Sequence, residues 1–259
     1  MVLKNNKSLG QHWLKDREIL DDIAACAASP QTRDSREAPD NVTALEIGPG
    51  LGTLTSSLLK HFDKVIAVEY DKRLADNLPK SFPGKNLEVI NADFLAYDLN
   101  QVASPYVVAG NIPYYITSPI IMKLLETDNR PERIVLLIQK EVAERIAAED
   151  GKESVLSLSV KNRAFVELGP VVPKEFFTPP PKVDSQIIIL EPHQPLVSDS
   201  VIKLIKLGFT SPRKKLSHNL NYEREKLLKV YDELGISHDA RPADLSLEAW
   251  QDLAVKLAA

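Results

Sequence analysis

Short apolar runs alternate with helix-like patterns along the first three quarters of the chain. Seven runs rich in Val, Ile and Leu have the length and composition of buried strands. They cover residues 44–47, 64–69, 87–91, 106–110, 133–139, 162–168 and 185–190. Apolar positions spaced three and four apart predict helices over residues 19–28, 52–60, 72–81, 119–126 and 140–148. This alternation predicts an α/β fold with a parallel sheet covered by helices on both faces. Only loop joins the last two strands, so one of them is expected to run antiparallel at the edge.

The strand pattern stops after Pro192. Helices are predicted from there on, over residues 200–208, 213–219, 223–234 and 246–257, and Ser246 is the expected N-cap of the last one. Two prolines within residues 191–195 mark a domain boundary. We therefore predict an α/β domain over residues 1–192 and a small helical domain over residues 193–259. A single domain, with these helices packed on the sheet, is the alternative.

Composition is ordinary for a soluble globular protein, with 44% hydrophobic and 26% charged residues in a chain of 259. The single cysteine, Cys26, excludes an internal disulfide and a cysteine-based zinc cluster, and no metal site is expected. Cys26 lies in an apolar helical run and is interpreted as a small buried hydrophobe. Residues 1–10 lack the apolar core of a signal peptide, and no apolar run is long enough to span a bilayer. We expect a cytoplasmic monomer without a membrane partner.

The distribution of charge is more informative than its sum. A net charge of −4 argues against a nucleic-acid partner. Between residues 201 and 229, however, eight Lys and Arg stand against two Glu. A second basic cluster opens the chain at Lys4, Lys7, Lys15 and Arg17. Either region is a nucleic-acid contact or a solvated charged face, and composition alone does not decide between them.

Three successive predicted strands end in groups suited to a nucleoside. Gly48, Gly50 and Gly52 follow the first strand, where they permit a tight turn and close approach of a ligand to the backbone. Glu69 ends the second strand, about twenty residues further on, where a carboxylate accepts hydrogen bonds from ribose hydroxyls. Asp93 follows the third strand and is placed to accept from an adenine amino group, with the ring of Phe94 beside it.

The identity of that nucleoside follows from the glycine spacing. The spacing is G-x-G-x-G, which is neither the G-x-G-x-x-G of dinucleotide enzymes nor a G-x-x-x-x-G-K-[ST] phosphate loop. NAD and ATP are therefore disfavoured. S-adenosylmethionine fits best, because its sulfonium is not a polyphosphate and needs no anion site.

The fourth strand ends in Asn111-Ile112-Pro113-Tyr114. The exocyclic amino group of adenine is a poor nucleophile because its lone pair is delocalised into the ring. Hydrogen bonds accepted from its N–H groups favour a pyramidal nitrogen with a free lone pair, and the Asn111 side-chain oxygen and the Ile112 carbonyl are placed to accept them. Pro113 stiffens the turn, and Tyr114 offers a face for stacking on a flipped-out base.

The chain resembles the ribosomal RNA adenine N6-methyltransferases through this N-I-P-Y motif. Further stretches resemble the small-subunit dimethyltransferases in particular. They are K-S-L-G-Q-H-W-L over residues 7–14, Q-K-E-V-A-E-R-I-A-A over 139–148, F-T-P-P-P-K-V-D-S over 177–185 and F-T-S-P-R-K-K-L over 209–216. The resemblance covers nearly the whole chain, from about residue 4 to 258. It implies a Rossmann-like class I S-adenosylmethionine methyltransferase with a small C-terminal helical domain.

The resemblance also implies functions and residues. The reaction would be N6,N6-dimethylation of two adjacent adenines near the 3′ end of 16S rRNA, within a small ribosomal subunit or its precursor. Tyr114 and Phe177 would hold the target adenine, and Arg213, Lys214 and Lys215 would contact RNA. The residues implied for the S-adenosylmethionine pocket are His12, Leu14, Gly48, Gly50, Glu69, Asp93 and Asn111.

The chain departs from the family pattern at four places. His12-Trp13 stands where the pattern has Asn-Phe, and Pro212 stands where it has Arg. Residues 153–159 replace the usual Y-G-x-L-S-V stretch, and the polar connector at residues 30–41 is longer than usual.

Two other functions are compatible with N-I-P-Y. One is the 23S rRNA methyltransferase activity of the macrolide-resistance type, which the proline-rich loop at residues 177–185 and the helix at 139–148 disfavour. The other is non-catalytic nucleic-acid binding, as in the mitochondrial transcription factors of this fold, which the complete set of Gly48, Glu69, Asp93 and Asn111 disfavours. A DNA adenine methyltransferase would need a sequence-reading domain larger than any evident here.

Overall fold

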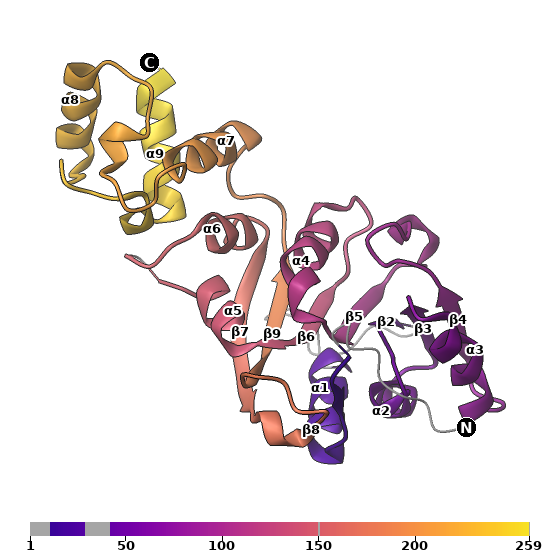
Figure 1. Cartoon of the computed structure of the whole chain (residues 1–259). Coiled ribbons are helices and arrows are strands. Elements are labelled where there is room, and N and C mark those ends of the chain that lie inside the picture. Colours follow the sequence, from indigo (N-terminus) through magenta and orange to yellow (C-terminus); the bar gives the residue numbers. More distant parts are fainter. Residues whose placement is uncertain (1–10, 29–41, 150, 259) are drawn as a thin grey trace. The chain divides into compact units, whose positions relative to one another are not determined.

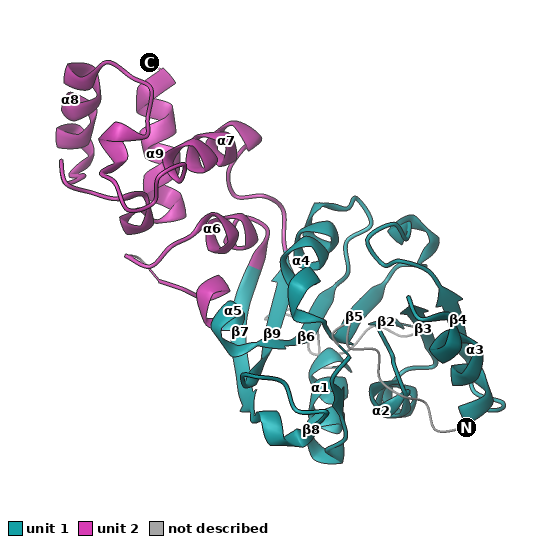
Figure 2. Ribbon diagram, in the orientation of Figure 1, with its two compact units in different colours: residues 1–143, 165–192 teal, residues 144–164, 193–259 magenta. Residues whose placement is uncertain are grey.

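The computed structural model describes residues 11–28, 42–149 and 151–258. Lys4, Lys7 and the connector at residues 30–41 lie outside them. The chain forms two compact units (Figure 2): residues 1–143 with 165–192, and residues 144–164 with 193–259. The second unit thus takes in residues 144–164, which the sequence analysis placed in the first domain.

The first unit is built on a seven-stranded sheet with the order β4-β3-β2-β5-β6-β9-β7 (Figure 1). The strands are β2 Thr43–Ile47, β3 Lys64–Glu69, β4 Leu87–Asn91, β5 Tyr106–Asn111, β6 Arg133–Gln139, β7 Ala164–Val172 and β9 Ser185–Pro192. The strands from β4 to β6 run parallel, whereas β9 is antiparallel to β6. The predicted α/β fold and the antiparallel member of the last strand pair are therefore confirmed.

Helices cover the sheet because its strands are apolar on both sides. The helices along this part of the chain are α1 Arg17–Ala28, α2 Thr53–His61, α3 Lys72–Ser81, α4 Thr117–Glu126 and α5 Lys140–Ile146. Leu20 and Ile23 of α1 and Leu58 of α2 pack on one face, against side chains such as Val107 and Leu137. Alternate residues of the same strands point to the other face and are buried as well. Both faces of the sheet are thus enclosed, as expected for parallel strands.

Cys26 packs against this core from α1 and is partly buried. Burial raises the pKa of its thiol, which disfavours the reactive thiolate. This agrees with its interpretation as a small hydrophobe.

A second, two-stranded ladder joins distant parts of the chain. β1 Trp13–Leu14 pairs antiparallel with β8 Phe177–Thr178, so that Leu14 lies opposite Phe177 and Trp13 opposite Thr178. Residues directly opposite each other in an antiparallel pair point to the same side. Phe177 therefore follows Leu14 into the core, and their side chains are 3% and 1% exposed.

The second unit is helical. It contains α6 Val155–Lys161, α7 Asp199–Gly208, α8 Arg224–Leu234 and α9 Leu247–Ala258. Its 3-10 turns are Leu216–His218 and Pro242–Asp244. The described residues of the first unit contain the 3-10 turns Leu99–Gln101, Tyr114–Ile116 and Lys174–Phe176. Trp250 is fully buried at the centre of the second unit's apolar core.

The predicted helix over residues 213–219 is wrong. Only Leu216–His218 is helical, as a 3-10 turn. The Leu216 N–H donates to the carbonyl of Ala240, and the Asn219 amide donates to the carbonyls of Gly208 and Ser211. These bonds hold the segment in a turn.

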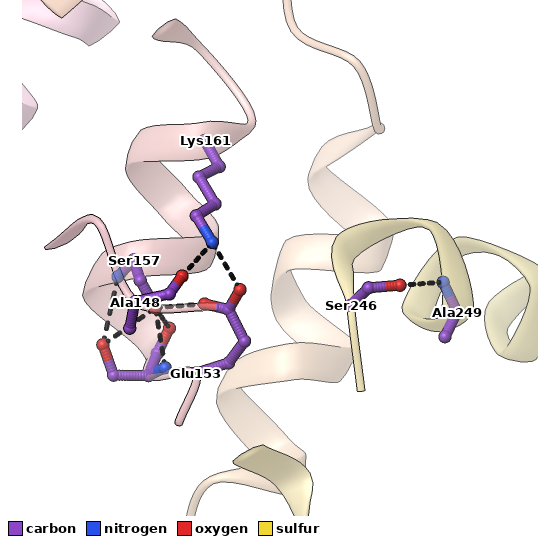
Figure 3. Close-up of polar contacts among 7 residues, drawn as sticks. Ala148, Glu153, Ser157, Lys161, Ser246 and Ala249 are labelled. Atoms are coloured by element: carbon purple, nitrogen blue, oxygen red, sulfur yellow. Dashed lines mark hydrogen bonds and ion pairs between the residues drawn. The ribbon is translucent and has the colours of Figure 1, made fainter. Parts of the chain in front are cut away.

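Helix α6 was not predicted, and the stretch that departs from the family pattern forms its start. Ser154 and Ser157 make a capping box. The buried Glu153 accepts from the Ser157 hydroxyl at 2.5 Å and pairs with Lys161 at 2.6 Å, and Lys161 also donates to the carbonyl of Ala148 (Figure 3). The same view shows Ser246 accepting from the Ala249 N–H at 3.2 Å, which confirms Ser246 as the N-cap of α9.

Candidate functional site

A cavity of about 310 Å³ lies at the carboxyl ends of the central strands of the first unit. The chain order reverses there, because β2 has β3 on one side and β5 on the other. Ligands of open α/β sheets bind outside the strand ends at such a point. The strand ends and the segments after them line the cavity: Ile47, Gly48 and Gly50, then Val68, Glu69 and Tyr70, then Ala92 to Leu95, and finally Asn111 to Ile116.

The glycine loop after β2 gives a ligand direct access to backbone. Gly48 has a φ of +64° and Gly50 a φ of +58°, which side chains rarely adopt. A Cβ at Gly48 would meet nothing within 4 Å, so this position opens onto free space. A Cβ at Gly52 would instead lie 2.6 Å from Leu78 Cδ1. The third glycine of the motif therefore serves helix packing, whereas the first two serve the cavity.

Glu69 is held as a hydrogen-bond acceptor at the end of β3. Its Oε2 accepts from the Gly50 N–H at 3.0 Å and its Oε1 from the Asp71 N–H at 2.8 Å. The Tyr70 N–H also acts on this carboxylate, and since each carboxylate oxygen has two acceptor positions, acceptor capacity remains for a ligand. A fixed carboxylate with remaining acceptor capacity suits the hydroxyls of a ribose. Burial raises the pKa of Glu69, and the backbone N–H groups oppose that shift.

A second carboxyl lies under the glycine loop. Glu46, in the middle of β2, accepts from the Thr55 hydroxyl at 2.5 Å. Complete burial raises its pKa to about 8. Glu46 is therefore largely neutral at pH 7.

Asp93 lies at the far side of the cavity, in the turn after β4. Its Oδ1 accepts from the Leu95 N–H at 2.9 Å, which leaves Oδ2 as an acceptor. Phe94 follows it and is buried against the cavity wall. The Asn91 amide donates to the carbonyls of Glu69 and Tyr70 and so ties the ends of β3 and β4 together. Asp93, Phe94 and Glu69 thus have fixed relative positions.

Asn111 presents its side-chain oxygen as an acceptor. Its Nδ2 donates to the His12 carbonyl at 2.9 Å. Because a carbonyl only accepts, this bond fixes which side of the amide is nitrogen, and no described residue donates to Oδ1. The Ile112 N–H donates to the Leu137 carbonyl at 3.1 Å, which holds the following peptide in place.

Tyr114 and His12 form a pair of nearly parallel rings in the cavity lining. Their centroids are 6.2 Å apart and their planes differ by 18°. The Tyr114 hydroxyl lies 3.0 Å from the Ser185 hydroxyl, and the His12 Nδ1 lies 2.7 Å from the carbonyl of Pro179. Each ring is therefore anchored at its polar end.

Two residues implied by the resemblance do not line the cavity. The side chains of Leu14 and Phe177 are buried in the core, because the β1–β8 ladder directs both to the same side. In this structure Phe177 therefore does not face the cavity. Phe176, one residue earlier, is 41% exposed.

The lining also contains residues outside the predicted site residues. They are Gln11, Trp13, Ile47, Val68, Tyr70, Ala92, Leu95, Tyr115 and Ile116. Trp13 lies against the glycine loop, since a Cβ at Gly50 would be 3.2 Å from its Nε1. The only sequence pattern that points to Trp13 as a lining residue is its alternation with the buried Leu14, and this pattern is only two residues long.

The charge of the lining distinguishes among cofactors. Glu69 and Asp93 are acidic, and no Lys or Arg is found among the described residues that line the cavity. A polyphosphate needs cationic or N–H-rich surroundings, whereas a sulfonium is itself a cation. The donor and acceptor set therefore fits a nucleoside that carries positive charge.

The predicted RNA contacts lie in the second unit. Arg213, Lys214 and Lys215 are exposed in the turn before Leu216. Lys215 forms an ion pair with Asp239. No ion pair is found for Arg213 or Lys214 within the part of the chain that the structure describes. In the same part, no helix has the length and hydropathy needed to cross a membrane.

Relatives of known name match the chain over nearly its full length. Ribosomal RNA small subunit methyltransferase A of Gloeobacter violaceus is 42% identical over 265 residues, which is 97% of this chain and 93% of the relative. The protein of the same name from a Picosynechococcus species is 40% identical over 276 residues, covering 98% of each chain.

Solved structures show the same fold. A dimethyladenosine transferase from Plasmodium falciparum has a TM-score of 0.79 at 30% identity and covers 95% of this chain and 98% of its own. The 23S rRNA methyltransferase ErmE has a TM-score of 0.76 at 30% identity and covers 95% and 100%.

The family model described as ribosomal RNA adenine dimethylase matches residues 2–259. With a motif at each of four strand ends and relatives of about 40% identity along its whole length, the chain belongs to the ribosomal RNA adenine dimethylase family.

Proposed function

We propose that the protein transfers methyl groups from S-adenosylmethionine to N6 of two adjacent adenines near the 3′ end of 16S rRNA, giving N6,N6-dimethyladenosine. The observation that supports this most strongly is the Asn111 amide, whose bond to the His12 carbonyl leaves Oδ1 as an acceptor beside the cavity. The relatives named for the small ribosomal subunit support the substrate.

The cofactor would be held by groups that are already fixed. Glu69 would accept from the ribose hydroxyls, Asp93 from the adenine amino group, and Gly48 would allow the ligand to approach the backbone closely. When bound, S-adenosylmethionine supplies an electrophilic methyl group on a cationic sulfur. The acidic lining favours that cation.

The target base would be activated by acceptors rather than by a strong base. Asn111 Oδ1 and the Ile112 carbonyl accept from the N6 amino group, which leaves its lone pair free to attack the methyl carbon. The bound cofactor would supply the methyl group and leave as S-adenosylhomocysteine, and the methylated, positively charged nitrogen would give up its proton to water. Tyr114, anchored through Ser185, offers its ring to the flipped base. The second transfer repeats this step on the remaining N–H.

A 23S rRNA substrate is the second candidate, because the fold of ErmE is nearly as similar as that of the dimethyladenosine transferase. The full-length relatives named for the small subunit favour the first. We propose that Arg213, Lys214 and Lys215 contact RNA phosphates. We also propose that the substrate is a small subunit or its precursor and that the protein acts as a cytoplasmic monomer.

The test is methyl transfer from labelled S-adenosylmethionine to three substrates: undermethylated small subunits, free 16S rRNA and large subunits. The proposal predicts N6,N6-dimethyladenosine at two adjacent positions of the 16S rRNA in undermethylated small subunits. Nucleoside mass spectrometry would detect it and primer extension would map it. Modification confined to large subunits would establish the second candidate. No transfer to any of them would refute both.

A further inference from the structure

We propose that the imidazole of His12 is a positioning residue, which acts on Asn111 and Tyr114 through the segment that it anchors. This inference rests on the proposed function. The family resemblance implies that residue 12 binds the cofactor. The contacts of the His12 side chain, however, lead to the groups proposed to hold the target base.

The first contact ends the β1–β8 ladder. The register that pairs Trp13 with Thr178 places His12 opposite Pro179. The Lys15 N–H donates to the Phe176 carbonyl, so the hydrogen-bonded pairs of the ladder are 15/176 and 13/178, and His12 and Pro179 share no backbone bond. The His12 Nδ1 lies 2.7 Å from the Pro179 carbonyl, and because that oxygen only accepts, Nδ1 carries the proton. The side chain thus supplies a hydrogen bond between the two segments at a pair where the backbone supplies none.

The second and third contacts reach the reaction centre. The His12 carbonyl accepts from Asn111 Nδ2 at 2.9 Å, and this bond directs Oδ1 to its acceptor position. The ring lies nearly parallel to that of Tyr114, which is held at its other end by Ser185. Residue 12 is therefore fixed through its ring, and its backbone fixes Asn111.

Loss of the Nδ1–H donor should free the end of the ladder and with it the carbonyl that orients Asn111. The bond requires a donor but not an aromatic ring. Asparagine, which the family pattern has at this position, places Nδ2 as many bonds from Cα as histidine places Nδ1. An Asn side chain can therefore replace the donor, whereas a Phe side chain keeps a ring without it.

Three variants separate the donor from the ring: His12→Asn, His12→Phe and His12→Ala. We expect the Phe and Ala variants to lose about fivefold or more in kcat for methyl transfer to undermethylated small subunits, the effect of about one net hydrogen bond. The Asn variant should regain most of that loss. The Kd for S-adenosylhomocysteine, measured by calorimetry, should change less than twofold in all three.

Hydrogen exchange gives a readout that does not depend on activity. Peptides covering residues 13–15 and 176–179 should exchange faster in the Phe and Ala variants and at the original rate in the Asn variant. The matched control is His193→Phe, which removes another Nδ1 contact to a carbonyl, that of Gln194 in the second unit. It should change neither kcat nor exchange in these peptides.

The inference is overturned if the Asn variant is as slow as the Ala variant, or if the Phe variant leaves exchange unchanged. It is also overturned if the loss lies in cofactor affinity rather than in kcat. If the unaltered protein methylates none of the particles, the proposed function fails, and the exchange measurements still decide whether His12 anchors the ladder.

Discussion

The cavity of the first unit and the basic turn of the second present their polar groups in opposite ways. Glu69 is 6% exposed and accepts two backbone N–H groups, and Asn111 is oriented by a single carbonyl. Arg213 and Lys214 are exposed in an irregular turn. Function at the cavity is therefore expected to depend on the exact positions of its side chains, and RNA binding at the turn on the number of unpaired positive charges. This difference predicts steep, residue-specific losses in the first and graded, salt-dependent losses in the second.

The largest effect is expected from Asn111→Ala. The variant loses the acceptor for the target amino group, and kcat should fall by about 100-fold or more, as when one preorganised polar group is removed from an active site. Methyl transfer under single-turnover conditions measures it, with circular dichroism as the check on folding. Cys26→Ala, a change in the core away from the cavity, should leave kcat unaltered. Near-normal turnover of the Asn111 variant would show that the nucleophile is activated elsewhere.

Glu69→Ala comes next. The variant removes both proposed ribose acceptors, and two charged hydrogen bonds at about 1.5–3 kcal/mol each correspond to at least a 100-fold weaker cofactor. Calorimetry with S-adenosylhomocysteine measures the change. Unaltered affinity in a folded variant would show that the end of β3 does not bind the cofactor.

The pH dependence of the same binding gives a sharper test. The raised pKa of Glu69 means that the carboxylate takes up its proton at a higher pH than an ordinary glutamate. Cofactor affinity should therefore be full above that pKa and fall as the pH drops through it. Glu69→Gln, which cannot titrate, should bind weakly and lack this fall. A fall of equal size in the Gln variant would assign the dependence to another group.

A smaller effect is expected from Arg213→Gln combined with Lys214→Gln. If both side chains meet phosphates, the log–log salt slope of RNA binding should decrease by about two, one for each contact. Lys80→Gln with Lys85→Gln removes the same charge from exposed positions of the first unit and is the control. Equal slopes in the two double variants would show that the basic turn is only a solvated face.

The smallest effect is expected from Lys215→Gln. Lys215 pairs with Asp239, and that pairing lowers the pKa of Asp239. Its charge is thus partly neutralised, and its loss should weaken RNA binding less than loss of Arg213 or Lys214. Asp239→Asn should strengthen RNA binding by releasing Lys215. Weaker binding of the Asn variant would contradict the proposed role of charge in this turn.

The sequence by itself determined the elements whose signals are local. Three strands, Lys64–Glu69, Leu87–Asn91 and Arg133–Gln139, have the predicted bounds to the residue, because each apolar run ends at a polar residue. The same strand ends placed Gly48, Glu69, Asp93 and Asn111 on one cavity, since carboxyl ends of parallel strands share one edge.

The helical second unit shows where local signals mislead. Residues 213–219 were expected to form a helix, but only Leu216–His218 does, as a 3-10 turn. The bond from Leu216 to the carbonyl of Ala240 and those from Asn219 to Gly208 and Ser211 use groups on other segments. No pattern within seven residues contains them.

Only the tertiary structure decided which residues around the cavity face it. The β1–β8 ladder is two residues long and joins positions more than 160 apart, so it leaves no periodic signal in either segment. That pairing buries Phe177 with Leu14, turns Trp13 toward Gly50 and brings the His12 imidazole to Pro179. The physical reason is that side-chain direction in a strand follows from its register with a partner, and the register here is set by a contact across the fold rather than along the chain.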